Sequence, residues 1–193
     1  IVSATGSTRM GHAVAQRVAA RFGRAVLELG GNNAAIICPS ADLELVLRGV
    51  AFAAMGTAGQ RCTSLRRLFV HKSIADKLLP RLKKVYGSVA IGDPRESGTL
   101  IGPLRDQAAF DTMQKGLEEA RASKGVVTGG ERVKTAAGDG GYYVRPALVE
   151  MPTQSEVVER ETFAPILYVM TYEDFDTVLE LHNAVPQGLS SSI

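Results

Sequence analysis

The chain has 193 residues, of which 45% are hydrophobic and 22% charged, a composition typical of globular proteins that bury an apolar core. Its 22 Lys and Arg residues nearly balance 20 Asp and Glu, so the formal net charge is +2, which argues against a partner that is a nucleic acid or an anionic membrane. No stretch approaches about 18 uninterrupted apolar residues, so we expect no membrane-spanning helix.

Strand-like and helix-like patterns alternate along the chain, which favours an α/β architecture. The first part predicts a strand over residues 1–4, a glycine-bounded turn over 6–11, a helix over about 11–22 and a strand over 25–29. In that helix the apolar residues recur with a period near 3.6. Gly30-Gly31 then mark the expected domain boundary.

Beyond this boundary the alternation continues. A strand over 34–37 precedes a helix that Ser40 or Asp42 caps, and a polar break follows near residue 58. Further strands are expected over 67–71, 126–128, 143–149 and 166–172, and further helices over 74–86 (capped by Ser73), 106–124 and 175–183. Loops rich in Gly and Pro are expected over 92–103 and 129–141, the second as a surface hairpin or a flexible loop.

The cysteines and histidines set limits on the chemistry. Cys38 and Cys62 lie in different surroundings and do not form a disulfide framework, so we expect reduced thiols and a cytoplasmic protein. The three histidines, His12, His71 and His182, lack the spacing of metal ligands. We therefore expect no metal site and interpret them as surface or packing residues.

Both ends of the chain are abrupt. It starts at Ile1, without an initiator Met, on what reads as a strand already under way, and it stops directly after three serines. We expect a piece of a longer protein; the alternative is a trimmed small protein that is otherwise complete.

The turn Gly6-Ser7-Thr8-Arg9-Met10-Gly11 stands between a predicted strand and a predicted helix. Free backbone N–H groups and the helix dipole favour an anion at such a helix N-terminus. Its glycine spacing is not that of the usual dinucleotide fingerprint. A phosphate site and a plain strand-to-helix turn both fit this pattern.

The segment Glu28-Leu29-Gly30-Gly31-Asn32-Asn33 places a carboxylate at the end of a predicted buried strand, before two glycines. Glycines there permit a positive φ and a close approach of the backbone to a ligand. A partly buried carboxylate could serve as a general base. The alternative is a strand-end Glu paired with a nearby Arg.

The segment Gly59-Gln60-Arg61-Cys62-Thr63-Ser64 places a thiol in a polar break, next to a cation. A nearby cation or oriented amides increase the thiolate fraction of such a cysteine. Cys38 instead ends an apolar run, which is typical of an inert thiol that packs as a small hydrophobe. Cys62 is therefore a candidate nucleophile, with a plain structural thiol as the alternative.

The segment Glu161-Thr162-Phe163-Ala164-Pro165 combines an acidic residue, an aromatic ring and a turn fixed by proline. It could hold a sugar hydroxyl and pack against a flat ring. The alternative is a cap of a helix or strand, with Phe163 in the core.

Taken in this order, the four segments resemble the motifs of the aldehyde dehydrogenase superfamily, and the resemblance covers the whole chain. It implies an α/β fold: most of a catalytic domain, a sheet with flanking helices, preceded by the last βαβ portion of a Rossmann-like cofactor domain. Residues 1–30 would be the tail of the NAD(P)-binding domain. Residues 31–193 would be the thiol-bearing domain, truncated at its C-terminal end.

The resemblance also implies a mechanism. The Cys62 thiolate would attack an aldehyde, its backbone N–H would help hold the oxyanion, and hydride transfer would leave a thioester that Glu28 hydrolyses through water. The cofactor would be NAD, with NADP not excluded. By the same matching its binding residues are Gly6, Ser7, Leu29, Gly30, Glu161 and Phe163.

A narrower resemblance, to the antiquitin branch, rests on the double Asn after the glycines and on Arg61 beside the thiol. Enzymes of that branch oxidise α-aminoadipic semialdehyde in lysine breakdown. Arg61 could pair with a substrate carboxylate, or it could form an internal salt bridge. Arg61 and Thr63 are the candidate substrate contacts, and other aldehydes remain alternative substrates.

Some of the family's pattern is missing. Ala4 replaces the usual aromatic before the cofactor turn, and the family's upstream half and downstream oligomerisation strand are absent. We therefore expect that the chain alone has no turnover and binds NAD weakly or not at all. It should also self-associate through the apolar surface that the missing segments leave exposed. For the full-length protein we expect a homodimer or a homotetramer. An acylating dehydrogenase and a non-catalytic homologue are the rival hypotheses.

Overall fold

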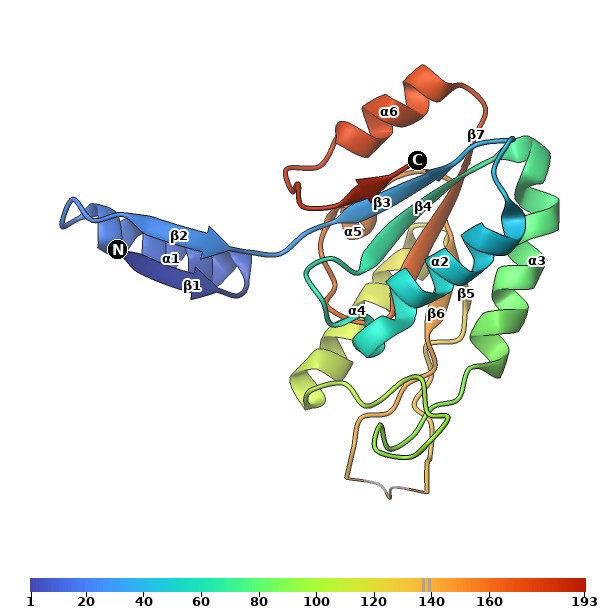
Figure 1. Ribbon diagram of the computed structural model, residues 1–193, viewed down its shortest axis with the longest axis horizontal. Helices are drawn as coiled ribbons and strands as arrows, with labels where there is room; N and C mark the ends of the chain where they lie inside the picture. The colour runs from blue at the N-terminus through green and yellow to red at the C-terminus, as the bar shows by residue number, and fades with distance from the viewer. Residues whose placement is uncertain (137, 139) are drawn as a thin grey trace. The chain divides into compact units, whose positions relative to one another are not determined.

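The computed structural model of the protein describes residues 1–136, 138 and 140–193 (Figure 1). The chain divides into two compact units, Ile1–Gly31 and Asn32–Ile193, and each is described by itself below. Part of the expected loop over 129–141, at residues 137 and 139, lies outside the described residues.

The first unit is a βαβ element. Strand β1 (Val2–Thr5) pairs in parallel with β2 (Ala25–Glu28), and helix α1 (Thr8–Ala19) connects them. The helix begins three residues earlier than the pattern predicts because Ser7 caps it, its hydroxyl oxygen accepting a hydrogen bond of 3.2 Å from the Met10 N–H. Gly11 therefore lies inside the helix rather than at its start.

The second unit is built on a six-stranded sheet in the order β5-β6-β7-β4-β3-β8, parallel except for the antiparallel edge strand β5. The strands are β3 (Asn33–Ile37), β4 (Leu65–His71), β5 (Val126–Thr128), β6 (Ala147–Glu150), β7 (Ile166–Tyr172) and β8 (Ser191–Ser192). Because parallel strands need crossovers, the segments that connect them run over the faces of the sheet.

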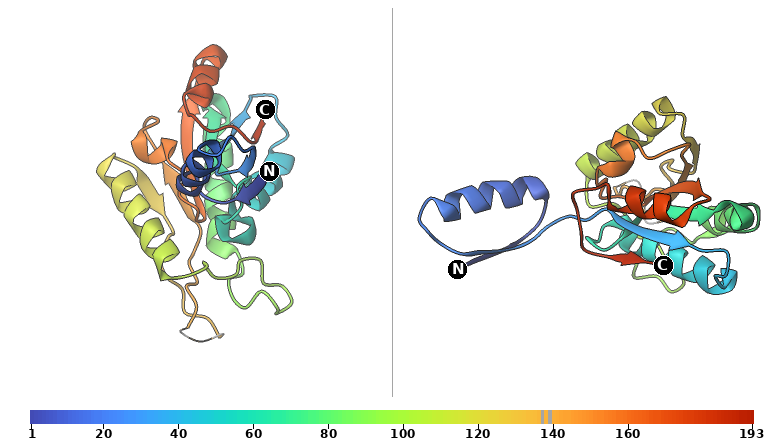
Figure 2. Two further views of the ribbon diagram at one scale, coloured as in Figure 1. Left: turned by 90° about the vertical axis from the view of Figure 1, so that its left-hand side faces the viewer. Right: turned by 90° about the horizontal axis from the view of Figure 1, so that it is seen from above.

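Helices cover both faces of this sheet, with α2 and α3 packed together on one face and α4, α5 and α6 over the other (Figures 1 and 2). Their bounds are α2 (Leu43–Met55), α3 (Lys72–Ser88), α4 (Gln107–Ala122), α5 (Glu156–Glu159) and α6 (Phe175–Asn183), and a short 3₁₀ turn, η1 (Gly56–Gly59), follows α2. Among the described helices, none has the length and apolar character that spanning a membrane requires.

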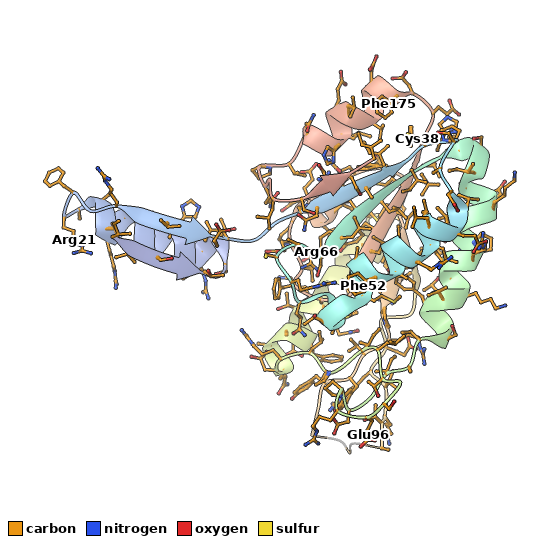
Figure 3. The ribbon with its side chains drawn as sticks, in the orientation of Figure 1. Arg21, Cys38, Phe52, Arg66, Glu96 and Phe175 are labelled. Atoms are coloured by element: carbon orange, nitrogen blue, oxygen red, sulfur yellow. The ribbon has the colours of Figure 1, made fainter. Side chains whose placement is uncertain are left out.

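The core lies along the central strands, which are buried on both faces and therefore read as almost continuous apolar runs. In β4, Leu68, Phe69 and Val70 have no exposed surface. The same strand also buries two cations, Arg66 and Arg67, at 2% and 1% exposure (Figure 3 labels Arg66). Buried charges need hydrogen-bond partners, so each of these two arginines must be surrounded by acceptor groups inside the fold.

Several local predictions need correction. Helix α3 is capped by His71, whose Nδ1 accepts from the Ser73 N–H at 3.2 Å, so Ser73 lies in the first turn and is not the cap. Strand β8 was not expected, because its serines carry no apolar alternation; pairing with Ala34 and Ala35 of β3 makes it a strand. The short helix α5 was not expected either.

The topology brings the segments before three strands to one edge of the sheet. Strand β4 pairs in parallel with β3 on one side and with β7 on the other. The residues that precede these neighbouring strands therefore meet at their amino ends. They include Cys62, before β4, and the segment from Glu161 to Pro165, before β7.

Candidate active site

In the first unit, a backbone hydrogen bond ties the glycine turn to the end of β2: the Gly6 N–H donates to the Glu28 carbonyl at 3.0 Å. Leu29 packs on the start of α1, since a side chain at Gly11 would lie 2.6 Å from a Leu29 methyl carbon. The Ser7 hydroxyl uses its oxygen as the cap acceptor, which leaves its O–H able to donate. This turn has the features of an anion site at a helix N-terminus.

Glu28 is exposed, and β2 is mostly exposed, whereas the sequence predicted a buried strand with a partly buried carboxylate. The cause is local, because in this unit a single helix packs on a two-stranded sheet. The alternative of a Glu28–Arg pair finds no support in the ion pairs of the described residues.

In the second unit, Cys62 is exposed on a loop that follows an unusual turn. Thr57, Ala58 and Gly59 all have positive φ, at 56°, 52° and 66°. Left-handed backbone is unfavourable for Thr and Ala, so the surrounding packing must hold it. At Gly59 even a methyl group is excluded, because a Cβ there would lie 2.4 Å from the carbonyl oxygen of Ala164.

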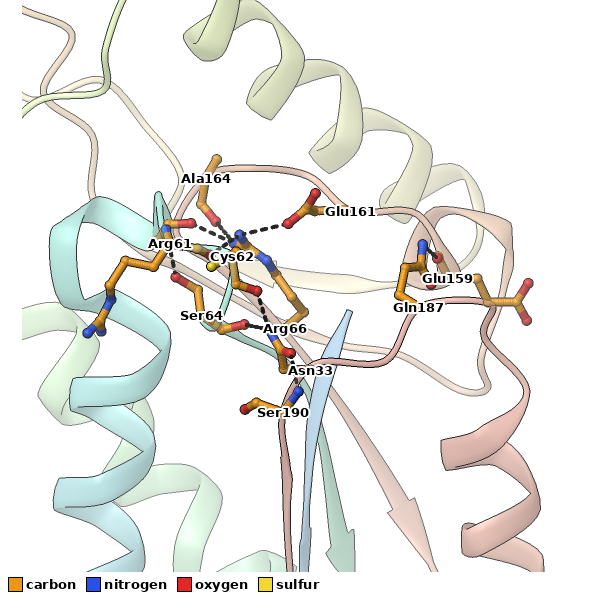
Figure 4. Close-up of polar contacts among 11 residues, drawn as sticks. Asn33, Arg61, Cys62, Ser64, Arg66, Glu159, Glu161, Ala164, Gln187 and Ser190 are labelled. Carbon is orange, nitrogen blue, oxygen red and sulfur yellow. Dashed lines mark hydrogen bonds and ion pairs between the residues drawn. The ribbon is translucent and has the colours of Figure 1, made fainter. Parts of the chain in front are cut away.

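Asn33 and Ser64 fix the same loop from below (Figure 4). The Asn33 side-chain amide donates to the carbonyls of Cys62 and Ser64, both at 2.8 Å, and its oxygen accepts from the Ser190 N–H at 3.1 Å. The Ser64 hydroxyl accepts from the Arg61 N–H at 3.2 Å. Backbone on both sides of the thiol is therefore held by buried polar side chains.

Arg66 reaches the loop from inside β4. Its Nη1 donates to the carbonyls of Gly59 and Ala164, at 2.7 and 2.9 Å, and its Nη2 to the carbonyl of Arg61 at 3.2 Å. The same Nη2 lies 3.7 Å from a carboxylate oxygen of Glu161. Burial lowers the pKa of Arg66 to about 10, and the charge of Glu161 is the largest influence that opposes this.

The predicted ring-binding turn is accessible. Phe163 is 45% exposed, so the alternative of a core phenylalanine is wrong, and the Arg66 guanidinium lies 5.5 Å from its ring centre. Glu161 points toward Arg66 in Figure 4. The structure thus brings together Cys62, Glu161 and Phe163 around one buried cation.

Arg61 points away from this group (Figure 4). Its guanidinium stacks over Phe52 at 5.0 Å, and its Nη2 donates to the Phe52 carbonyl in the last turn of α2 at 3.1 Å. A cation there is favoured by the helix dipole. No ion pair of Arg61 occurs within the described part of the chain, so the alternative of an internal salt bridge finds no support, and Arg61 instead bonds the C-terminal turn of α2. Thr63, the other candidate substrate contact, is exposed and lines a cavity of about 640 Å³ between α2 and β3.

The sequence of the chain matches a known protein family. The model of the aldehyde dehydrogenase family matches residues 1–193, the whole chain. The chain belongs to the aldehyde dehydrogenase family.

Relatives in this family are longer than the chain. It is 47% identical over 194 aligned positions to aldehyde dehydrogenase family 7 member A1 of Brassica napus, and 47% identical to the alpha-aminoadipic semialdehyde dehydrogenase of Bos taurus. All of the chain is covered in both matches, but only 38% and 35% of those proteins. The chain therefore spans well under half the length of these relatives, and the narrower resemblance to the antiquitin branch is confirmed.

Solved aldehyde dehydrogenase structures match over the same extent. The betaine aldehyde dehydrogenase of Staphylococcus aureus in complex with NAD⁺ aligns with a TM-score of 0.95 and 26% identity, over 100% of this chain and 39% of that one. An aldehyde dehydrogenase from Bacillus cereus aligns with a TM-score of 0.94 and 29% identity, over the same shares. The expected α/β family fold is confirmed.

Sequence reasoning assigned no role in this candidate site to three residues that hold its thiol loop: Asn33, Ser64 and Arg66. Arg67 was missed as well; its guanidinium donates to the carbonyls of Asn32 and His182 and to the side chain of Gln154. The sequence did hold one signal. The run from Leu65 to Val70 is apolar except for two adjacent arginines. A buried strand can hold two such cations only if each has its own hydrogen-bond acceptors.

Proposed function

We propose that the chain is part of a longer enzyme that oxidises an aldehyde to a carboxylic acid with a nicotinamide cofactor. The observation that carries the proposal is the exposed Cys62 thiol on a loop that Arg66 ties to the turn bearing Glu161. A fixed loop with an accessible thiol is what nucleophilic attack on a carbonyl carbon needs.

Within this proposal each residue has a distinct role. The Cys62 thiolate attacks the aldehyde carbon, and its backbone N–H stabilises the oxyanion that forms. The adduct would then lose the hydride of the former aldehyde carbon to the bound nicotinamide and become a thioester on Cys62. Glu28 takes a proton from the water that attacks this thioester, which releases the acid and frees the thiol. Glu28 is the last residue of β2 and its side chain is exposed, so the carboxylate is accessible to water.

Residues of the chain fit the cofactor. The capped N-terminus of α1, with Gly6 and the Ser7 O–H, suits the pyrophosphate. The Glu161 carboxylate suits the hydroxyls of the nicotinamide ribose, and the accessible Phe163 ring suits the flank of the nicotinamide. Leu29 and Gly30 would contribute backbone contacts to the nicotinamide. When bound, this cofactor supplies the hydride acceptor.

For the substrate we propose α-aminoadipic semialdehyde, on the similarity to the Bos taurus enzyme named for it. Arg61 and Thr63 are the proposed contacts. To reach a substrate carboxylate, the Arg61 guanidinium has to leave Phe52, over which it stacks at 5.0 Å. A carboxylate offers it a bidentate, charge-assisted pair in exchange.

A substrate panel on the full-length enzyme tests the proposal. Oxidation should be measured with α-aminoadipic semialdehyde, betaine aldehyde, succinic semialdehyde and a simple aliphatic aldehyde, with Arg61→Met as a second enzyme. We expect the highest kcat/KM for the carboxylate-bearing aminoadipic substrate, and we expect Arg61→Met to erase that preference while sparing the aliphatic aldehyde. Equal kcat/KM across the panel would refute the substrate, and no oxidation of any aldehyde would refute the activity.

A further inference from the structure

Arg66 joins two segments that lie about a hundred positions apart in the chain, 59–64 around the thiol and 161–165 around Glu161. Three of its hydrogen bonds go to backbone carbonyls, on Gly59, Arg61 and Ala164, at 2.7–3.2 Å. Side chains that bind carbonyls on two separate segments fix the distance between those segments, because a shift of one breaks bonds to the other.

The planar guanidinium is suited to this task. Both Nη1 protons are used, one on each segment, and Nη2 is divided between the Arg61 carbonyl and the Glu161 carboxylate. A lysine at this position has one nitrogen and no fixed fork, so it cannot reproduce contacts in these directions. The geometry, rather than the charge alone, distinguishes arginine here.

Withdrawing the Arg66 charge from water costs free energy. That cost indicates that the contacts of Arg66 serve a purpose that an apolar residue could not. The Arg66 side chain is 3% exposed and the Glu161 side chain 18%, so this cation and its partner are both withdrawn from water. Its Nε–H, moreover, is buried with no hydrogen-bond partner among the described residues. An apolar side chain would fill the same space in β4 without these penalties.

Direct packing reinforces the link. The backbone of Gly59 lies so close to Ala164 and Pro165 that a Cβ would meet their backbone atoms at 2.4–2.6 Å. The thiol loop and the Glu161 segment therefore form one rigid contact, with Arg66 beneath it. The pair is placed at the amino ends of β4 and β7, which are themselves hydrogen-bonded neighbours.

We propose that Arg66 is a positioning residue that holds the Glu161 carboxylate and the Cys62 loop in one fixed arrangement, so that cofactor ribose and thiol are aligned together. This rests on the proposed function for the role of Glu161, but the fixed arrangement itself does not. Arg66 touches neither the substrate nor the reacting carbon; it acts through Glu161 and through the carbonyls of Gly59, Arg61 and Ala164.

A double-mutant cycle tests the link to Glu161 in the full-length enzyme. Arg66→Met and Glu161→Gln should each raise the KM for the nicotinamide cofactor at least tenfold, with a smaller effect on the KM for aldehyde. The double variant should be no worse than Glu161→Gln alone, because one effect acts through the other. Arg66→Lys should recover little of the loss. Multiplying effects in the double variant, or full rescue by lysine, would overturn the proposal.

A second measurement needs no activity and separates this inference from the proposed function. Hydrogen exchange of the full-length protein, followed by mass spectrometry, should show faster exchange in Arg66→Met at peptides covering 59–64 and 161–165 together. Leu78→Ala, a buried change in α3, is the control for general destabilisation and should speed exchange throughout α3 instead.

The outcomes are distinguishable. Coupled loosening of the two segments in a protein that oxidises no aldehyde would retain the positioning role and reject the enzyme. An active enzyme in which Arg66→Met leaves exchange in both segments unchanged, or speeds exchange across the whole sheet instead of in these two segments, would support the proposed activity and contradict the positioning role.

Discussion

The side-chain amide of Asn33 donates a hydrogen bond of 2.8 Å to the carbonyl of Cys62, the proposed nucleophile. A second proton of the same amide binds the Ser64 carbonyl at 2.8 Å. Asn33 begins β3 and is 2% exposed, so the thiol loop is anchored to the interior of the sheet and not only to its own strand. The Cys62 sulfur is therefore accessible, while the backbone that carries it is held in place by hydrogen bonds.

Removing this anchor should destabilise the protein. Asn33→Ala leaves two carbonyls without their donor, and an unpaired buried acceptor costs about 1–3 kcal/mol. The Ser64 carbonyl is buried but that of Cys62 only partly so. We therefore expect a loss of about 2–4 kcal/mol in the free energy of unfolding. Urea denaturation measures it, with the exposed Asn183→Ala as the matched control. A loss no larger than that of the control would show that the anchor contributes little.

Two glycines offer opposite outcomes for the same substitution. Gly59→Ala combines a φ of 66° with a Cβ 2.4 Å from the Ala164 oxygen, so we expect a loss of stability above about 2 kcal/mol. Gly49→Ala lies in α2 with nothing within 4 Å of the new carbon and should stabilise by about 0.5–1 kcal/mol. Thermal unfolding of the two variants decides this, and a stable Gly59→Ala protein would contradict the described turn.

The two thiols should differ in reactivity. Cys62 is exposed, whereas Cys38 is only partly exposed and lies 3.6 Å from the Tyr172 hydroxyl. Iodoacetamide labelling followed by peptide mass spectrometry should modify Cys62 several times faster than Cys38. Equal slow labelling of both would favour the non-catalytic homologue.

His182 should make stability fall in mild acid. Burial, and to a smaller extent Arg67, lowers the pKa of His182 below its usual 6.5. The folded protein therefore disfavours the protonated imidazole. The free energy of unfolding keeps its full value above pH 6.5 and declines as the pH falls below that value. We expect a smaller drop in Tm between pH 7 and pH 5 in His182→Gln than in the parent. An identical drop in both proteins would remove His182 as the cause.

Elements with strong periodicity could be predicted from the sequence. Strand β7 and helix α6 have the expected bounds, because each is a regular pattern between clear turn residues. Strand β8 could not be predicted, since Ser191 and Ser192 form a strand only by pairing with β3, more than 150 positions earlier. Likewise His71, and not Ser73, caps α3. The sequence does not show this, because it depends on where the His71 side chain points.

For the site, the motifs could be found but not what supports them. Cys62, Glu161 and Phe163 were recognised because their local patterns carry chemistry. Asn33 and Arg66 were not, because their roles come from contacts with residues 29 and 98 positions away. The orientation of Arg61 toward Phe52 also depends on the turn between them, where three successive residues have positive φ.

Glu28→Gln in the full-length enzyme tests the central claim most directly, since in the proposed mechanism Cys62 forms the thioester and Glu28 is required only to hydrolyse it. Mixing this variant with cofactor and aldehyde should give a burst of reduced cofactor of about one equivalent per site, followed by almost no steady-state turnover, and intact mass spectrometry should find the acyl group on Cys62. Steady-state acid formation at the parent rate, with no acyl group on Cys62, would contradict the account.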